Sequence, residues 1–398
     1  SVKNTVVISN KEERTRITDG AIVKDCTMQW GAQISTGALT EGSIFTEHSG
    51  ADRHGKVFDS LIGANTNIAE GEVTSSLVGS FVGFHHQALL ISAFWPGGKG
   101  NIAYGSNIGS NHTGKEPDQE LWPGEGMFFG LDCAIKYPAD FTNSPYSIIS
   151  SGTITLPQKV SFPFSLINSP SINFDDISPA FNEIFPAWIL SDNFFMIKRN
   201  EEKYRQRNRA KRIHLKFSIF RPSIVDKMVD AEGRLKVASM KDVYTESDIE
   251  GLGKNYLLES NRIKAINTYD YYIRYYCLNL MFRYLLTHKT SEADLDEILH
   301  QSTDDEEWEH ARNLFLSRLE FSSLNEAGIT LIEIKNAIAK QIFESKQRDD
   351  LRGEKITKGY NEAHVLAEDN EFVKKTMDQT QTYEQKIRKF LKSPKVGA

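Results

Sequence analysis

Three histidines in the first third of the chain are candidates for a catalytic base: His112, His85 and His86. An imidazole titrates near the working pH of most enzymes. It can therefore take a proton from an attacking hydroxyl or amine, which accelerates a reaction by about 10²–10⁴-fold. His112 is our first choice, because the segment after it is rich in carboxylates and amides that can orient a base. In the alternative interpretation, His112 caps a turn by bonding a neighbouring backbone group.

His85 and His86 are consecutive, and consecutive residues of a strand face opposite sides. Only one of them can face a given cleft, so we favour a structural role for this pair. Residues that can contact the hydroxyls or phosphate of a sugar surround the first candidate along the chain. The predicted substrate-binding residues are Asn107, Asn111, Asp118, Lys136 and Tyr137, with Asp140 as a further candidate. Aromatic residues that could stack on a sugar ring, or anchor loops, are Trp95, Trp122, Phe128 and Phe129.

Other kinds of site are weaker predictions. Histidines from neighbouring turns could hold zinc, but their spacing matches no familiar ligand pattern, and we predict no metal site. The segment Gly109 to Lys115 spells a phosphate-binding loop, yet Glu116 stands where a Ser or Thr hydroxyl would bind magnesium. The run from Lys198 to Lys216 contains nine Lys or Arg residues. It is interpreted as a solvated helix face, or alternatively as a basic wall on which an anionic cosubstrate docks.

The elements that would position these residues are short strands. An aliphatic residue followed by a small one returns after six positions, as Ile62-Gly and Ile68-Ala and again as Ile102-Ala and Ile108-Gly. A fixed short period with β-branched residues predicts a chain coiled into stacked strands. A second set keeps the same spacing and is predicted to point inward: Ile148, Ile154, Val160 and Leu166. The register breaks at 48–56, 85–100 and 113–126, where we predict protruding loops.

The composition changes near residue 175, after which glycine becomes rare and apolar residues recur at helical spacing. The prediction is a β-solenoid domain over 1–175 and a mostly α-helical domain over 176–398. One long helix is expected around Ile263 to Tyr284, and its tyrosines are interpreted as core and interface residues. N-caps are predicted at Ser291, with Asp294, and at Thr303, with Glu306. Helix faces are then expected at Trp308, Ala311, Phe315 and Leu319, at Ile334, Ile338 and Ile342, and in a polar helix over 371–391.

Composition bounds the remaining choices. The net charge of −6 gives no electrostatic case for nucleic acid or a membrane surface. The sequence has no run of 18 apolar residues, so no transmembrane helix is predicted. Three cysteines, odd in number and far apart, suit a reducing compartment, so a cytoplasmic location is expected. Because the chain begins with Ser1, we expect a fragment of a longer protein whose first coil is trimmed.

The Ile-Gly-x-x-x-Asn hexads resemble the hexapeptide-repeat family. A bacterial branch of this family, of unknown function and with a helical C-terminal domain, is similar to three segments of the chain: Gly97 to Gly126, Ile135 to Pro138 and Leu156 to Val160. That resemblance implies a left-handed parallel β-helix, three hexads to a coil, and assembly as a homotrimer. Many family members are acyltransferases that use acetyl-CoA or acyl carrier protein. In those enzymes a histidine deprotonates a sugar hydroxyl or amine, which matches the role given to His112.

Two functions follow from these patterns. The first is a transferase acting on a sugar or nucleotide sugar, with His112 as general base. The second is a non-catalytic oligomeric scaffold or ligand-binding protein whose helical domain presents the binding surface. The cofactor stays unknown, with acetyl-CoA as a candidate, because about 220 residues of helical domain replace the short CoA-binding helix of the acyltransferases.

Overall fold

The computed structural model describes residues 1–84, 86–109, 120–288, 295–301 and 303–392. The chain forms two compact units, each made of three segments. The first unit contains Ser1–Ile189, Glu201–Phe217 and Asp230–Ile266; the second contains Leu190–Asn200, Ser218–Val229 and Asn267–Ala398. The division at residue 175 stays a prediction.

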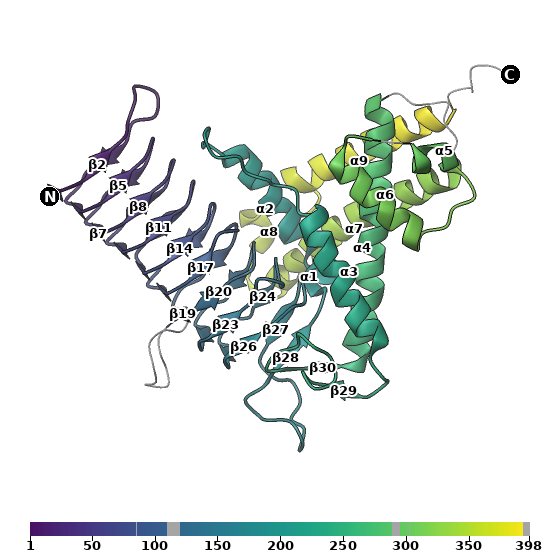
Figure 1. Ribbon diagram of the computed structural model, residues 1–398, viewed down its shortest axis with the longest axis horizontal. Helices are drawn as coiled ribbons and strands as arrows, with labels where there is room; N and C mark the ends of the chain where they lie inside the picture. Colours follow the sequence, from purple (N-terminus) through teal and green to yellow (C-terminus); the bar gives the residue numbers. More distant parts are fainter. Residues whose placement is uncertain (85, 110–119, 289–294, 302, 393–398) are drawn as a thin grey trace. The chain divides into compact units, whose positions relative to one another are not determined.

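The first unit contains a parallel β-solenoid of about 9 turns, as predicted, and Figure 1 shows its short strands stacked from the N-terminus onward. Sheet A consists of β1 (Val2–Lys3), β4 (Ile22–Lys24), β7 (Leu39–Glu41), β10 (Lys56–Phe58), β13 (Glu72–Thr74), β16 (Leu89–Ile91), β19 (Asn107–Ile108), β22 (Ala134–Ile135) and β25 (Ile154–Thr155). Sheet B consists of β2 (Val6–Val7), β5 (Thr27–Met28), β8 (Ile44–Phe45), β11 (Leu61–Ile62), β14 (Leu77–Val78) and β17 (Phe94–Trp95).

Two further sheets complete the solenoid. Sheet C consists of β3 (Arg16–Ile17), β6 (Gln33–Ile34), β9 (Gly50–Asp52), β12 (Asn67–Ala69), β15 (Gly83–Phe84), β18 (Asn101–Ile102), β21 (Phe128–Phe129), β24 (Ile148–Ile149) and β27 (Leu166–Asn168), extended by β28 (Asn182–Phe185), β30 (Asn255–Leu258) and β29 (Val243–Tyr244). Sheet D consists of β20 (Leu121–Trp122), β23 (Ala139–Asp140) and β26 (Gln158–Lys159), and an Ala93–Leu121 bridge joins β20 to the end of sheet B.

The early turns are 17 residues long, one fewer than three hexads. Ile22 pairs with Leu39, and Leu39 pairs with Lys56. The register breaks at 48–56 and 85–100 are therefore not loops, because these segments contain β9, β16 and β17. The predicted loop at 113–126 lies partly outside the described residues, and β20 occupies part of the rest.

The buried residues recur at the predicted spacing of six, but in the later turns the buried residue of each strand is not the predicted one. The hexad residues Ile62, Ile68, Ile102 and Ile108 are all fully buried, as expected. Later in the coil the inward residues are Ile149, Thr155 and Ile167, while Ile154 is 55% exposed. The prediction that Ile148, Ile154 and Leu166 point inward is wrong by one residue, which moves a strand residue to the opposite face.

The helices of the described chain follow the strands. They are α1 (Trp188–Asp192), α2 (Phe194–Arg207), α3 (Pro222–Val237), α4 (Glu259–His288), α5 (Leu295–His300), α6 (Glu306–Arg318), α7 (Leu324–Ile356), α8 (Tyr360–Ala363) and α9 (Glu371–Lys392). Helix α4 contains the predicted long helix, with Ile273, Cys277 and Leu280 buried. The predicted faces of α6 and α7 are buried too.

One predicted N-cap is wrong by two residues. The side chain of Asp305, rather than Thr303, accepts a hydrogen bond from Trp308 N at 3.0 Å, and Thr303 bonds the Asp305 backbone instead. A carboxylate at the cap also complements the positive end of the helix. The other predicted cap, Ser291 with Asp294, lies outside the described residues. No helix in the described parts of the chain is long and apolar enough to cross a membrane.

Candidate functional site

A shallow groove of about 750 Å³ lies on sheet D of the first unit. All three strands of the sheet contribute to it, together with the prolines that precede β23 and β26. The lining residues are Glu120, Trp122, Pro138, Ala139, Asp140, Pro157, Gln158 and Lys159. The groove therefore combines an aromatic surface, two carboxylates, an amide and an ammonium group.

Strand register brings three of these side chains into one outward row. Trp122 pairs with Asp140, and Asp140 pairs with Lys159. Neighbouring strands lie about 4.8 Å apart, so the row places an indole, a carboxylate and an ammonium group within about 10 Å. These residues are 18 and 19 positions apart in the sequence, and only the stacking of turns brings them together.

Trp122 is held in place while one side of its ring stays open. Its indole Nε1 donates to Glu120 Oε2 at 2.8 Å, and the Phe94 ring packs 4.6 Å away at 51°. The residue is nevertheless 39% exposed. A fixed, half-exposed indole is a platform for the apolar face of a sugar ring or for a planar base.

The floor of the groove contains a polar group without a partner. Gln158 is 8% exposed, and its Oε1 accepts from Lys254 N and from Asn255 Nδ2 at 2.9 and 2.8 Å. Its Nε2 is buried and has no hydrogen-bond partner among the described residues. Asp140 Oδ1 accepts from Thr142 N at 2.9 Å, and Lys159 forms no ion pair with a described residue. The groove thus offers a cation, Lys159, and carboxylate acceptors to a ligand, while the unpaired Gln158 amide nitrogen is buried.

An added Cβ at Gly109 would lie 2.1 Å from the Tyr137 hydroxyl, and Glu120 lines the groove. The segment between these two residues contains the predicted base. His112, Asn111 and Asp118 lie within it, outside the described residues, and their roles stay predictions. His85 also lies outside the described residues.

The described candidates are divided between two places on the coil. His86 lies at the corner that leads into sheet A, where its Nδ1 is 2.8 Å from Glu70 Oε2. Lys136 and Tyr137 follow sheet A, at the corner that leads toward the groove. Asn107 starts β19, and its Oδ1 is buried without a partner among the described residues. The structure therefore does not bring His86 together with Lys136 and Tyr137.

Tyr137 is a structural residue in this geometry. Its hydroxyl donates to Ile91 O at 2.6 Å, and burial raises the pKa of the phenol above its ordinary value. Trp95 and Phe129, two of the predicted stacking residues, are fully buried in the core. The sequence analysis missed Phe94, Gln158 and Lys159. Their signal was the spacing of the stacked turns, which becomes readable only once the register is known.

The basic run is not only a solvated helix face, and its alternative role as a basic wall for an anionic cosubstrate stays a prediction. Its segment Glu201–Phe217, here called the strap, belongs to the first unit. Arg212 bonds Glu47 Oε1 at 2.6 Å and Glu13 Oε2 at 2.9 Å, and its guanidinium lies 3.9 Å from the Trp30 ring centre. Farther along, the Tyr204 hydroxyl donates to Lys99 O at 3.1 Å. The strap thus contacts several turns of the coil.

Acid is expected to loosen the strap. The hydrogen bond from Arg212 is the main reason that the pKa of Glu13 falls from 4.5 to about 2. Burial alone would raise the pKa of Glu47. Hydrogen bonds from the Arg212 backbone and side chain outweigh the effect of burial, so the pKa of Glu47 is lowered. Because these pKa values are lower in the folded state, the two carboxylates stabilise the fold fully above about pH 4.5, and this stabilisation is lost toward pH 2. In urea unfolding, Glu13→Gln should flatten this acid dependence. The exposed neighbour gives the control, Glu12→Gln, and an equal effect of both changes would contradict the assignment.

Among the described residues, no three His, Cys, Asp or Glu side chains are arranged to hold a metal ion. No family model matches the chain. Over 233 residues, or 58% of this chain, the sequence is 27% identical to an uncharacterised protein of Treponema pallidum (strain Nichols). The match spans 31% of that protein, so the aligned part of this chain covers about a third of its relative's length.

Proposed function

We propose that the first unit is a hexapeptide-repeat transferase that binds a sugar or nucleotide sugar in the sheet D groove. The observation that carries the proposal is the outward row of Trp122, Asp140 and Lys159 in a groove that Glu120, eight positions after His112 in the sequence, also lines. The coil is a β-solenoid, the fold on which transferases of this kind are built. Fold alone does not establish an activity, so the proposal rests on the side chains that line the groove.

Each group in the groove suits a different part of such a substrate. The indole of Trp122 covers the apolar face of a pyranose ring, or a base. Asp140 and Glu120 accept hydrogen bonds from hydroxyl groups. Lys159 neutralises an anionic group such as a phosphate. In the reaction, His112 takes the proton from the attacking hydroxyl or amine, and the acyl donor remains to be identified.

Replacing the platform should weaken sugar binding about tenfold to a hundredfold, because truncated aromatic anchors commonly cost about 2 kcal/mol. The experiment compares wild type with Trp122→Ala against a panel of nucleotide sugars and sugar phosphates. A ligand of the native state raises the melting temperature, and calorimetry then gives its affinity. Tyr104→Ala, another half-exposed aromatic of the coil, should bind like wild type. If no member of the panel binds wild type, the scaffold function replaces this proposal.

We also propose that the coil assembles as a homotrimer through sheet B. Its outward row runs through Val6, Thr27, Ile44, Leu61, Leu77 and Phe94, and every residue of this row except Thr27 is apolar. Ile44→Glu should reduce the mass measured by light scattering to that of one chain, because it places a charge in a desolvated interface. Ile22→Glu, at an equally exposed isoleucine of sheet A, should leave the mass unchanged. A wild-type protein that is monomeric at micromolar concentration would exclude this assembly.

A further inference from the structure

The second unit contains a lysine in an unusual setting. Lys335, on α7, has its Nζ 4.2 Å from the ring centre of Tyr383 on α9 and 5.3 Å from that of Tyr275 on α4. Among the described residues it forms no hydrogen bond and no ion pair. The carboxylate of Glu384, next to Tyr383, is already bound by Asn336 and Arg388 at 3.0 and 2.7 Å. No described acid therefore neutralises Lys335.

The groups around Lys335 favour its uncharged amine. Burial, and with it the positive charge of Lys198 on α2, lowers the pKa of the amine to about 8. The two ring faces attract an ammonium ion and oppose this trend. The Tyr383 phenol is neutral, since burial raises its pKa to about 12. A desolvated lysine beside a second cation is the usual arrangement of a nucleophilic amine.

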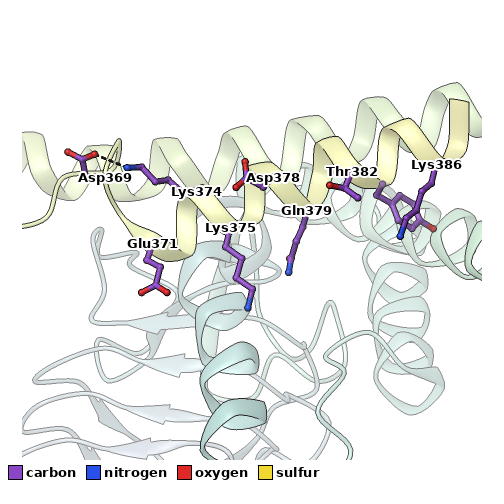
Figure 2. Close-up of a pocket in the computed structure, with 9 residues that line it drawn as sticks. Asp369, Glu371, Lys374, Lys375, Asp378, Gln379, Thr382 and Lys386 are labelled. Atoms are coloured by element: carbon purple, nitrogen blue, oxygen red, sulfur yellow. Dashed lines mark hydrogen bonds and ion pairs between the residues drawn. The ribbon is translucent and has the colours of Figure 1, made fainter. Parts of the chain in front are cut away.

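A groove lies beside one of the two rings that cover this amine. The groove has a volume of about 820 Å³ and is lined by one face of α9 and the residue Asp369. Figure 2 shows Glu371, Lys375 and Gln379 projecting from this face. Tyr383 also lines the groove, and its hydroxyl is buried without a hydrogen-bond partner among the described residues. The ring that covers Lys335 is thus also a wall of the groove.

We propose that Lys335 forms an imine with a small 2-oxo acid that enters the groove beside α9. The Nζ lone pair attacks the carbonyl carbon, and the carbonyl electrons move to the oxygen. The resulting carbinolamine loses its hydroxyl together with the nitrogen proton as water, which leaves the C=N bond. The Tyr275 and Tyr383 rings cover the flat carbonyl group. Lys386 lines the groove without a described ion pair and can meet the carboxylate of the acid.

The test is reductive trapping on the full chain. Wild type is incubated with glyoxylate or pyruvate and sodium cyanoborohydride over the neutral to alkaline range, and labelled lysines are quantified by peptide mass spectrometry. Lys335 should be labelled about tenfold faster than the exposed Lys355 of the same helix near neutral pH, because more of its amine is uncharged. Half-maximal labelling is expected near the pKa of about 8.

Two variants sharpen the result. Lys198→Gln removes the neighbouring charge and should move the labelling profile of Lys335 to higher pH. Lys335→Met should remove the fast label and leave the label on Lys355. If Lys335→Met fails to fold, the labelling rates of Lys335 and Lys355 in wild type still test the proposal. Labelling of Lys335 no faster than Lys355, or none at all, overturns the proposal. Sugar binding in the first unit is independent of either outcome.

Discussion

Ile149→Asp is expected to unfold the coil, while Ile154→Asp leaves it folded. Ile149 is fully buried and Ile154 is 55% exposed, although the hexad spacing placed Ile154 inside. An aspartate at 149 has no partner among the apolar residues of the inward row. It should therefore cost more than about 4 kcal/mol. At position 154 the charge reaches water, and the cost should be about 1 kcal/mol or less.

The measurement is urea unfolding followed by circular dichroism, with both variants compared with wild type. The pair is matched, since both residues are isoleucines in strands of neighbouring sheets near the end of the coil. Equal destabilisation by the two changes would contradict the register described here. A stable Ile149→Asp protein would do so as well.

The second large effect is expected in catalysis. His112→Ala should lower kcat about 10²–10⁴-fold with little change in KM, because a general base acts in the transition state and contributes little to substrate binding. The melting temperature should stay near that of wild type. The assay uses the sugar identified by the binding panel and follows transfer from acetyl-CoA or another acyl donor.

Two comparisons make this assignment specific. His54→Ala removes an exposed corner histidine of the same coil and should leave turnover unchanged. His86→Ala tests the rival base, whose Nδ1 lies 2.8 Å from Glu70 Oε2 at a different corner. If His86→Ala abolishes turnover and His112→Ala does not, the base is wrongly assigned. A Trp122→Ala variant should instead raise KM, because the platform holds substrate and transition state alike.

The groove shows how far residue types can indicate a site. Trp122 and Asp140 were recognised as polar or aromatic candidates from the sequence. Their pairing with Lys159 depends on turn length, which varies along the coil. Asn107 pairs with Ala134, 27 positions later, whereas Leu39 pairs with Lys56, 17 positions later. No fixed period predicts such a row.

The strap illustrates the same limit for charges. The run from Lys198 to Lys216 is visibly basic, and its average environment was interpreted as solvent. In the structure Arg212 joins Glu13 and Glu47, which lie 199 and 165 positions away in the chain. A local sequence pattern contains no information about partners at that distance.

The sequence by itself determined the class of each half. A short apolar period with glycine and asparagine corners specifies stacked strands, and helical spacing specifies α4, α6 and α7, because these preferences act within one or two turns of chain. Only the tertiary structure decided which side of a strand is buried, since adjacent isoleucines such as Ile148 and Ile149 are equally apolar. It also decided which distant residues meet. The outward row of the groove and the rings around Lys335 come from separate turns and helices, whose contacts depend on packing rather than on local preference.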